Sequence, residues 1–187
     1  MKSNIGILLL VCLVTKSFSQ NVFTARNTSF SKAFEQILLD YPNNFQNISG
    51  DLVLSQGEYE HYASRIALPG AKQCIVGKYH SIEDTTASWQ ATMPAFESFE
   101  EAAKQYRQLF RQLKTAPVTL VDGSKLYLVG DIAEIDESLD FSVSTLYFPT
   151  ADLRYRHFKI ELELLYSMHE WVIHLNMVRR KPDDQRW

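Results

Sequence analysis

Apolar side chains recur at helical spacing near the start of the chain and again near its middle. In the first segment, residues 30–41, they fall at steps of three and four positions, which places them on one face of a helix. Pro42 ends this helix because proline cannot continue the hydrogen-bond ladder, and Ser29 is the expected N-cap residue. The apolar face consists of Phe30, Ala33, Phe34, Ile37, Leu38 and Tyr41.

The second predicted helix runs from Ser98 to about Lys114, and both of its ends are well defined. Ser98 and Glu101 have the capping-box spacing, which satisfies two backbone N–H groups that a helix leaves free. Acidic residues occupy the first turn and basic residues the last, as the helix dipole favours. Pro117 marks the exit. The apolar stripe consists of Phe99, Ala102, Ala103, Tyr106, Leu109, Phe110 and Leu113.

Most of the remaining chain has the short apolar runs that are typical of β-strands. Two such runs, residues 72–79 and 86–93, are separated by a polar loop at 81–84. Another strand is expected at 141–148. These strands follow one another closely, so antiparallel neighbours are predicted.

Two hairpins are predicted in the second half of the chain. Asp122-Gly123 lies between apolar runs, and both residue types tolerate the positive φ that tight hairpin turns require. The C-terminal segments 157–166 and 171–177 alternate strictly, so a one-residue slip would turn one apolar set to water. The predicted cross-strand pairs are Tyr166 with Trp171, Leu164 with Ile173, Leu162 with Leu175, and Ile160 with Met177.

These elements predict an α+β fold, in which two amphipathic helices pack on an antiparallel β-sheet of six to eight strands. Residues 29–93 and 98–179 also resemble each other weakly, with Trp89 and Trp171 in the last strand of each. Two interpretations stay open. The halves are a tandem repeat of one helix followed by three or four strands, or two stretches of the same type that agree by chance.

The first nineteen residues have the pattern of a secretory signal peptide. Lys2 precedes an apolar run, Ile5 to Val14, and Ser17 and Ser19 supply the small residues that a signal peptidase recognises. The run is about half of the roughly 20 residues that span a bilayer. We therefore expect cleavage before Gln20, a single domain over residues 20–187, no stable membrane anchor, and an exported protein that is periplasmic or extracellular.

Charge makes nucleic acid an unexpected partner. Without the predicted signal peptide, the chain has 17 basic and 22 acidic residues, a net charge of −5. The one basic cluster, Arg179-Arg180-Lys181, is followed directly by Asp183 and Asp184. Neutralisation of phosphates needs clustered lysine and arginine, which this chain lacks.

Cysteine and glycine usage excludes several common chemistries. Cys12 lies in the predicted signal peptide, so Cys74 is the only cysteine of the mature chain and no internal disulfide can form. Cys74 stands in an apolar run, where a free thiol is typically an inert small hydrophobe. Phosphate-binding glycine loops, dinucleotide fingerprints and nucleophile elbows are absent from the sequence, and no cofactor is expected.

Carboxylates and imidazoles near the C-terminus give the one candidate catalytic group. His169 and His174 are five residues apart on a predicted strand, so they point to opposite faces and cannot share a zinc ion. The hairpin register places Glu163 opposite His174, with Glu161 two residues along the same face. These three residues could orient a base or hold a metal ion, or they are charged residues of a solvated sheet face.

Residues 131–140 form an acidic stretch between two predicted strands. Calcium loops carry oxygen ligands at alternate positions and a glycine that turns the chain. Here Ile132, Ala133 and Ile135 interrupt the pattern and no glycine lies within it. A charged loop is expected, and no metal site is predicted.

Aromatic content suggests a binding role. The chain has 9 Tyr, 11 Phe and 3 Trp, and some of these rings are expected to line a surface groove or cavity. We predict an exported, non-catalytic module that binds an apolar small molecule or a protein segment, with Trp89, Tyr147 and Trp171 at the binding surface. The alternative hypothesis is a secreted or periplasmic hydrolase, or a metal-assisted enzyme, that uses Glu161, Glu163 and His174.

Overall fold

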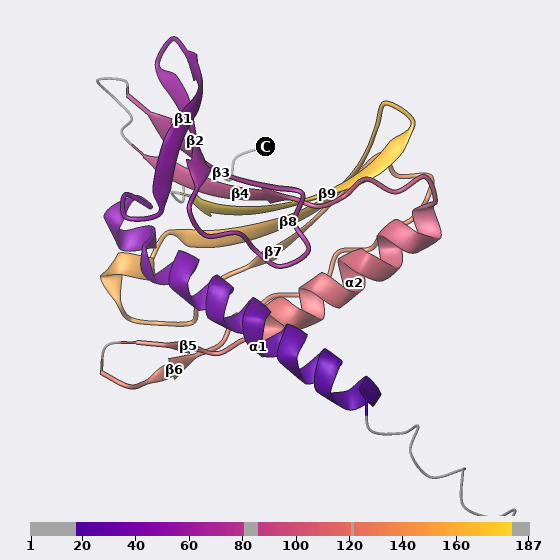
Figure 1. The fold of residues 1–187 in the computed structure, drawn as a ribbon, viewed down its shortest axis with the longest axis horizontal. Helices are drawn as coiled ribbons and strands as arrows, with labels where there is room; N and C mark the ends of the chain where they lie inside the picture. Colours follow the sequence, from indigo (N-terminus) through magenta and orange to yellow (C-terminus); the bar gives the residue numbers. More distant parts are fainter. Residues whose placement is uncertain (1–17, 81–85, 121, 181–187) are drawn as a thin grey trace, which may run out of the picture.

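The described residues form one seven-stranded antiparallel sheet, a small two-stranded sheet and two long helices (Figure 1). The computed structural model describes residues 18–80, 86–120 and 122–180, with side chains described from Ser29 onward. The elements are α1 (Phe18–Leu39), η1 (Tyr41–Asn43), β1 (Ser49–Gln56), β2 (Tyr59–Ser64), β3 (Gln73–Tyr79), β4 (Ala87–Thr92), α2 (Phe99–Thr115), β5 (Val118–Thr119), β6 (Lys125–Leu126), β7 (Phe141–Leu146), η2 (Leu153–Tyr155), β8 (Phe158–Ser167) and β9 (Glu170–Arg179).

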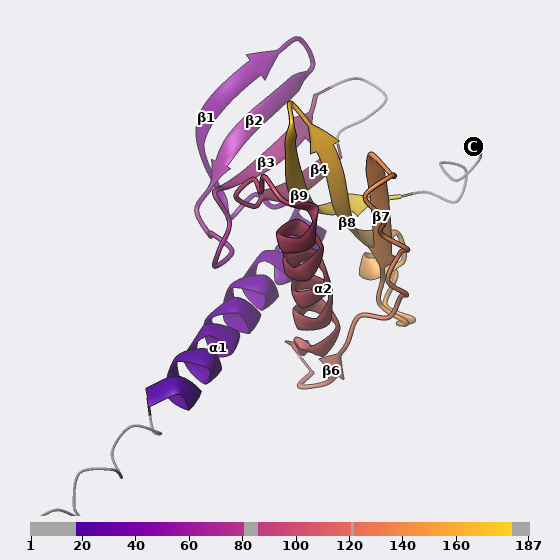
Figure 2. The same ribbon diagram turned by 90° about the vertical axis from the view of Figure 1, so that its right-hand side faces the viewer.

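The large sheet has the strand order β1-β2-β3-β4-β9-β8-β7, and every neighbouring pair is antiparallel. Both helices lie on the same side of this sheet, and no helix of the described residues covers its other side (Figures 1 and 2). The predicted α+β class and the predicted antiparallel sheet are confirmed. Within the described residues, no helix combines the length and the apolar character that crossing a membrane would require.

The predicted register of the C-terminal hairpin is confirmed. Tyr166 lies opposite Trp171, and the other three predicted pairs follow in the same ladder. Side chains of β8 and β9 are alternately buried and half-buried, because one face packs under the helices. Tyr166, at the end of the ladder, is the one partner that stays 41% exposed.

Helix α2 begins where the sequence predicts. The Ser98 hydroxyl accepts a hydrogen bond from the Glu101 backbone N–H at 3.4 Å, which caps the first turn. Deeper in the helix, the buried Tyr106 hydroxyl bonds the Ser144 hydroxyl at 2.6 Å and donates to the Leu162 carbonyl at 2.9 Å. These bonds join α2 to β7 and β8 through the core.

The predicted start of the first helix is wrong. Ser29 lies inside α1, which begins at Phe18, so this serine does not cap the helix. Serine is preferred at N-caps but is also tolerated inside helices, and the residues before Ser29 continue the helix here. The predicted cleavage position, before Gln20, falls in the first turn of α1, and the rest of the predicted signal peptide lies outside the described residues.

Asp40 organises the chain immediately after α1. Only 6% of this residue is exposed. Its carboxylate accepts hydrogen bonds from the Asn43 side chain, from both the backbone and the side chain of Asn47, and from the Ile48 backbone N–H, at 2.6 to 3.2 Å. The loop between α1 and β1 is therefore folded around one buried carboxylate.

The remaining strands differ in how well they were predicted. Strands β3 and β4 match the predicted runs, while the polar loop predicted at 81–84 lies outside the described residues. The Asp122-Gly123 hairpin forms, but its strands β5 and β6 are only two residues long. Gly123 has φ +81°, in agreement with the predicted turn.

The two edges of the large sheet differ. Residues 129–134 run beside β7: Val129 and Tyr147 exchange two backbone hydrogen bonds of 2.9 Å, and the Ala133 N–H donates to the Ser144 hydroxyl. No described segment pairs with the outer edge of β1. Leu52, Val53 and Leu54 on β1 are 54%, 56% and 42% exposed.

Candidate functional site

The helix-free face of the sheet carries a row of polar side chains across its centre. Strand alternation aims Glu161 and Glu163 of β8 and His174 and Asn176 of β9 at this face, opposite the buried residues of the same strands. His174 Nδ1 lies 3.7 Å from a Glu163 carboxylate oxygen. On β4, Gln90 donates a 2.8 Å hydrogen bond to Asn176.

The structure brings the predicted catalytic candidates onto one face, but Glu161 already has a strong partner. The Arg180 guanidinium donates two hydrogen bonds of 2.8 Å to the Glu161 carboxylate. Glu163 and His174 form the remaining pair. Among the described side chains, no group of three or more histidine, cysteine, aspartate and glutamate residues is arranged to hold a metal ion.

Apolar side chains lie on the same face, at the end of the sheet next to the β8–β9 turn. Phe141 lies opposite Leu165, and Leu165 lies opposite Val172, so three apolar residues form a row across β7, β8 and β9. Val143 lies two positions along β7 from Phe141. We call Phe141, Val143, Leu165 and Val172 the apolar patch. Phe141 is 55% exposed and Val143 38% exposed, while Leu165 and Val172 are half-buried.

The structure does not bring together the three aromatic residues predicted to bind a ligand. Trp89 is fully buried, and its indole N–H donates to the Ser64 hydroxyl at 3.0 Å. Trp171 is also buried and packs edge-on against Phe99, with ring centroids 5.0 Å apart. Tyr147 is exposed, and the Lys159 ammonium lies 4.4 Å from its ring centroid.

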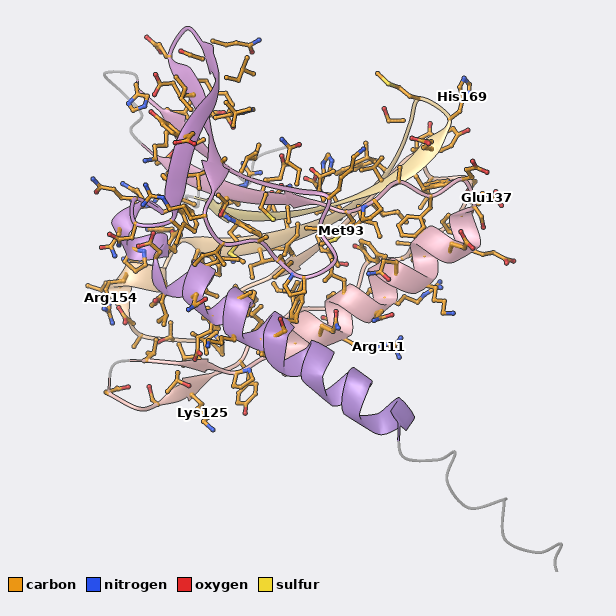
Figure 3. The ribbon with its side chains drawn as sticks, viewed as in Figure 1. Met93, Arg111, Lys125, Glu137, Arg154 and His169 are labelled. Atoms are coloured by element: carbon orange, nitrogen blue, oxygen red, sulfur yellow. The ribbon has the colours of Figure 1, made fainter. Side chains whose placement is uncertain are left out.

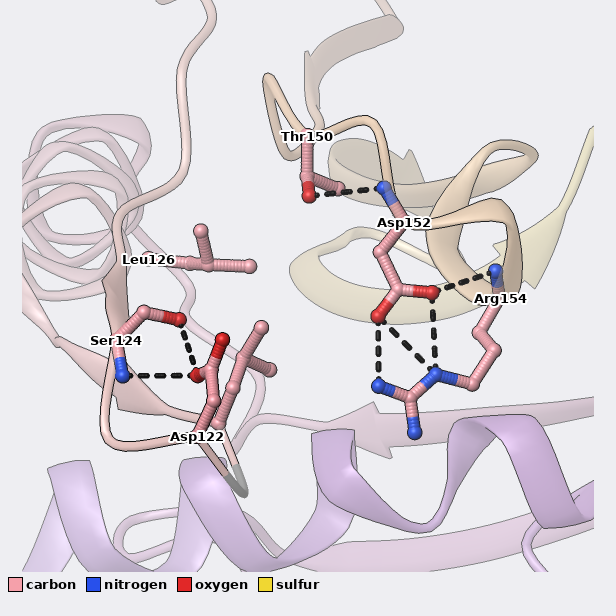
Figure 4. Close-up of a pocket in the computed structure, with 7 residues that line it drawn as sticks. Asp122, Ser124, Leu126, Thr150, Asp152 and Arg154 are labelled. Atoms are coloured by element: carbon pink, nitrogen blue, oxygen red, sulfur yellow. Dashed lines mark hydrogen bonds and ion pairs between the residues drawn. The ribbon is translucent and has the colours of Figure 1, made fainter.

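A pocket of about 400 Å³ lies between the β5–β6 hairpin and the loop before β8 (Figure 4). The Arg154 guanidinium is hydrogen-bonded to the Asp152 carboxylate, and the Asp122 carboxylate accepts from the Ser124 backbone and hydroxyl. These bonds hold the pKa values of Asp152 and Asp122 below their usual range. The polar groups that line the pocket therefore bind one another. The lining residues are Leu120, Asp122, Ser124, Leu126, Thr150, Asp152 and Arg154.

Cys74 lies on the buried side of β3 and is only partly accessible. The Leu68 backbone N–H donates to its sulfur at 3.4 Å. Burial raises the pKa of the thiol, with the Leu68 bond a smaller opposing effect. A raised pKa leaves less of the reactive thiolate at any pH near neutrality, which is the opposite of what a nucleophile needs.

We expect Cys74 to react slowly with iodoacetamide at about pH 8, since the ordinary thiol pKa of about 8.5 is raised by burial. Unfolding in urea should restore the ordinary rate. The measurement is the mass shift against time for folded and urea-treated protein. Equal rates in the two states would show that the thiol is not buried and that its pKa is not raised.

The residues that sequence analysis missed are those of the apolar patch. Their three strands were predicted, but alternation in β7 favours burial of Phe141 and Val143, and the structure buries Ser142 and Ser144 instead. The alternate exposure along β7 shows which set of its side chains faces the helices.

Comparison of the chain with protein-family models, with curated protein sequences and with solved structures found no significant match.

Proposed function

We propose that the protein is an exported, non-catalytic interaction module that binds a protein segment on the helix-free face of its sheet. The observation that supports this function is the apolar patch. Phe141 and Val143 are exposed on a face where neither helix lies, and the half-buried Leu165 and Val172 continue the patch inward. Apolar patches with a polar rim are typical of protein interaction sites.

A protein segment fits this surface better than a small apolar molecule does. Small-molecule sites are concave and enclose most of the ligand surface. The described pocket lies at the other end of the sheet, near Arg154 and Lys125, and its lining includes three charged groups. The apolar patch instead presents side chains of three neighbouring strands on an open face.

No specific observation supports the catalytic alternative. Glu161, Glu163 and His174 do share one face, but the Arg180 guanidinium binds Glu161. The contact between Glu163 and His174 has the geometry of a cross-strand charge pair. A hydrolase or metal-assisted enzyme that uses these residues stays a prediction from the sequence.

We also propose that the two halves of the chain are a tandem repeat. Each helix is followed by strands, and the last strand of each set lies at the centre of the sheet, where β4 pairs with β9. From this centre the order β4-β3-β2-β1 runs one way and β9-β8-β7 the other. Chance similarity of two helix-then-strand units would give the same order.

A random-peptide display library, panned on the immobilised protein, tests the proposed function. We expect clones that bind the wild type and are lost on Phe141→Thr, because threonine keeps the strand preference and removes the ring. The matched control is Leu153→Thr, which removes a 78% exposed apolar side chain of η2, at the other end of the sheet. If every retained clone binds Phe141→Thr as well as wild type, the proposed function is wrong.

A further inference from the structure

We infer that the apolar patch is the docking site for a basic amphipathic helix of a partner protein. This inference rests on the proposed function and adds the charge of the partner and its secondary structure. The apolar side chains form the site, and the carboxylates around them select what binds there.

Exposed apolar side chains gather at one end of the sheet. Besides Phe141 and Val143 of the patch, Leu139 is 44% exposed, and Met168, in the β8–β9 turn, is 92% exposed. The Tyr166 N–H donates to the Asp140 carbonyl at 2.8 Å, so the start of β7 and the end of β8 are held side by side. Single exposed apolar residues are ordinary, but a group of this size marks an interaction surface.

The chain around these side chains is strongly acidic. Residues 126–153 contain no lysine or arginine, and neither do residues 160–178. The first stretch has exposed carboxylates at Asp131, Glu134, Asp136, Glu137 and Asp140, and the second has an exposed carboxylate at Glu170 and the partly buried Glu163.

These charges lie at the same end of the molecule as the apolar patch. Figure 3 shows Glu137 and His169 at one end of the sheet, and Arg154 and Lys125 at the opposite end. An apolar surface rimmed by carboxylates attracts a positively charged partner and repels an acidic protein or an anionic membrane. The partner is therefore basic as well as apolar.

The covered edge of β7 determines the backbone form of the partner. Residues 129–134 already run beside that edge. Val129 pairs with Tyr147 just past β7, and the Ser142 and Ser144 hydroxyls hold the segment along the strand, so an added strand would have to displace it. An extended segment laid across this open face would make no backbone hydrogen bonds to the sheet, so side-chain contacts alone would hold it. A helix satisfies its backbone internally and presents one apolar stripe.

The size of the row agrees with one helical stripe. Phe141, Leu165 and Val172 lie on three adjacent strands, which spans about 10 Å at the usual strand spacing. Positions i and i+7 of a helix, two turns apart, also lie about 10 Å from each other. Leucines at helical spacing can therefore contact the whole row.

Three fluorescein-labelled peptides of about 18 residues test the inference; this length is enough for a marginal helix in water. All three carry leucine at helical spacing, and the remaining positions alternate alanine with lysine, glutamine or glutamate. We expect the lysine peptide to bind most tightly by fluorescence anisotropy. Phe141→Thr should weaken it at least about tenfold, as loss of an aromatic anchor at an interface does, and Leu153→Thr should leave it unchanged.

A pair of charge variants tests the role of the carboxylates. Glu137→Gln with Asp140→Asn neutralises two exposed groups beside the patch, and Asp51→Asn with Glu58→Gln neutralises a matched exposed pair on the β1–β2 hairpin. The first variant should weaken binding of the lysine peptide about fivefold at about 0.1 M salt, and the second should not, because the Debye length is then about 10 Å and more distant surface charges are screened. Thermal unfolding of each variant checks that the fold is intact.

Each outcome decides between the inference and the proposed function. Equal, Phe141-dependent binding of the lysine and glutamine peptides would overturn the inference and leave the proposed function standing. The lysine peptide could bind Phe141→Thr as tightly as wild type, or its affinity could fall equally in both charge variants. Either result would indicate non-specific attraction and would overturn the inference. If the lysine peptide does not bind, the inference is also wrong, and the display library then shows whether the proposed function survives.

Discussion

Replacing Trp89 by alanine is expected to destabilise the fold by about 4 kcal/mol, within the usual range for a fully buried tryptophan. Trp89 is 0% exposed and lies on β4, the central strand of the seven. The substitution removes the packing of the indole and also the hydrogen bond that its N–H donates to Ser64. The measurement is the free energy of unfolding in urea, followed by circular dichroism.

Tyr147→Ala is the matched control, since Tyr147, directly after β7, is another aromatic residue of the predicted binding set. It is 42% exposed, so its loss should cost less than about 1 kcal/mol, as surface substitutions usually do. Trp89→Phe should fall between the two, because a ring remains but the bond to Ser64 is lost. A Trp89→Ala protein as stable as Tyr147→Ala would mean that the Trp89 side chain does not lie in the core.

Replacing Asp40 by alanine is expected to cost about 3 kcal/mol of stability, because hydrogen bonds to a buried charged group are strong and their loss leaves donors unpaired. Its carboxylate accepts from Asn43, Asn47 and Ile48, and the residue is 6% exposed. Without this acceptor the buried Ile48 N–H loses its partner. The loop from α1 to β1 should then open before the rest of the fold, which hydrogen exchange at Asn47 and Ile48 would detect.

Asp136→Ala provides the comparison for Asp40. The Asp136 carboxylate also accepts from a backbone N–H and a side chain, both of Ser138, but it is exposed to water. Water replaces the carboxylate as the partner of Ser138, so only a small change in the free energy of unfolding is expected. If the two aspartate variants lose equal stability, burial of Asp40 does not strengthen its bonds.

The elements predicted correctly are those whose periodicity and ends agree. For α2, the capping residue, the charges of the two ends and the apolar stripe all indicate the same segment, and the helix starts after Ser98. For β8 and β9, only one register buries both apolar sets, and Tyr166 does lie opposite Trp171. In both cases local pattern and tertiary burial favour the same structure.

Other features of the fold depend on contacts that the sequence pattern does not contain. Strands β1 and β2 carry no clear alternation of apolar and polar residues, and their side chains are exposed or half-buried. The two-residue hydrophobic period therefore does not predict these strands. Asp40 resembles a surface aspartate in the sequence. Its role depends on Asn47 and Ile48, seven and eight residues further on, which turn back to it only in the folded loop.

The candidate site was predictable only in part. The facing pair Glu163 and His174 follows from the hairpin register alone. The exposure of Phe141 does not, because alternation in β7 would turn Phe141 and Val143 toward the core, whereas the structure buries the serines between and after them instead. Trp89 shows the reverse case, since a ring that composition suggests for a surface groove fills the core instead.

The unequal edges of the large sheet limit how molecules of this protein can join through their backbones. The described segment beside β7 closes one side, and the outer side of β1, with Leu52 and Val53 exposed, is free of any described neighbour. A fibril that grows by strand addition needs two exposed edge strands on every subunit. A subunit with one exposed edge strand can form only a dimer in this way, so edge-to-edge association of the folded protein is expected to stop at two copies.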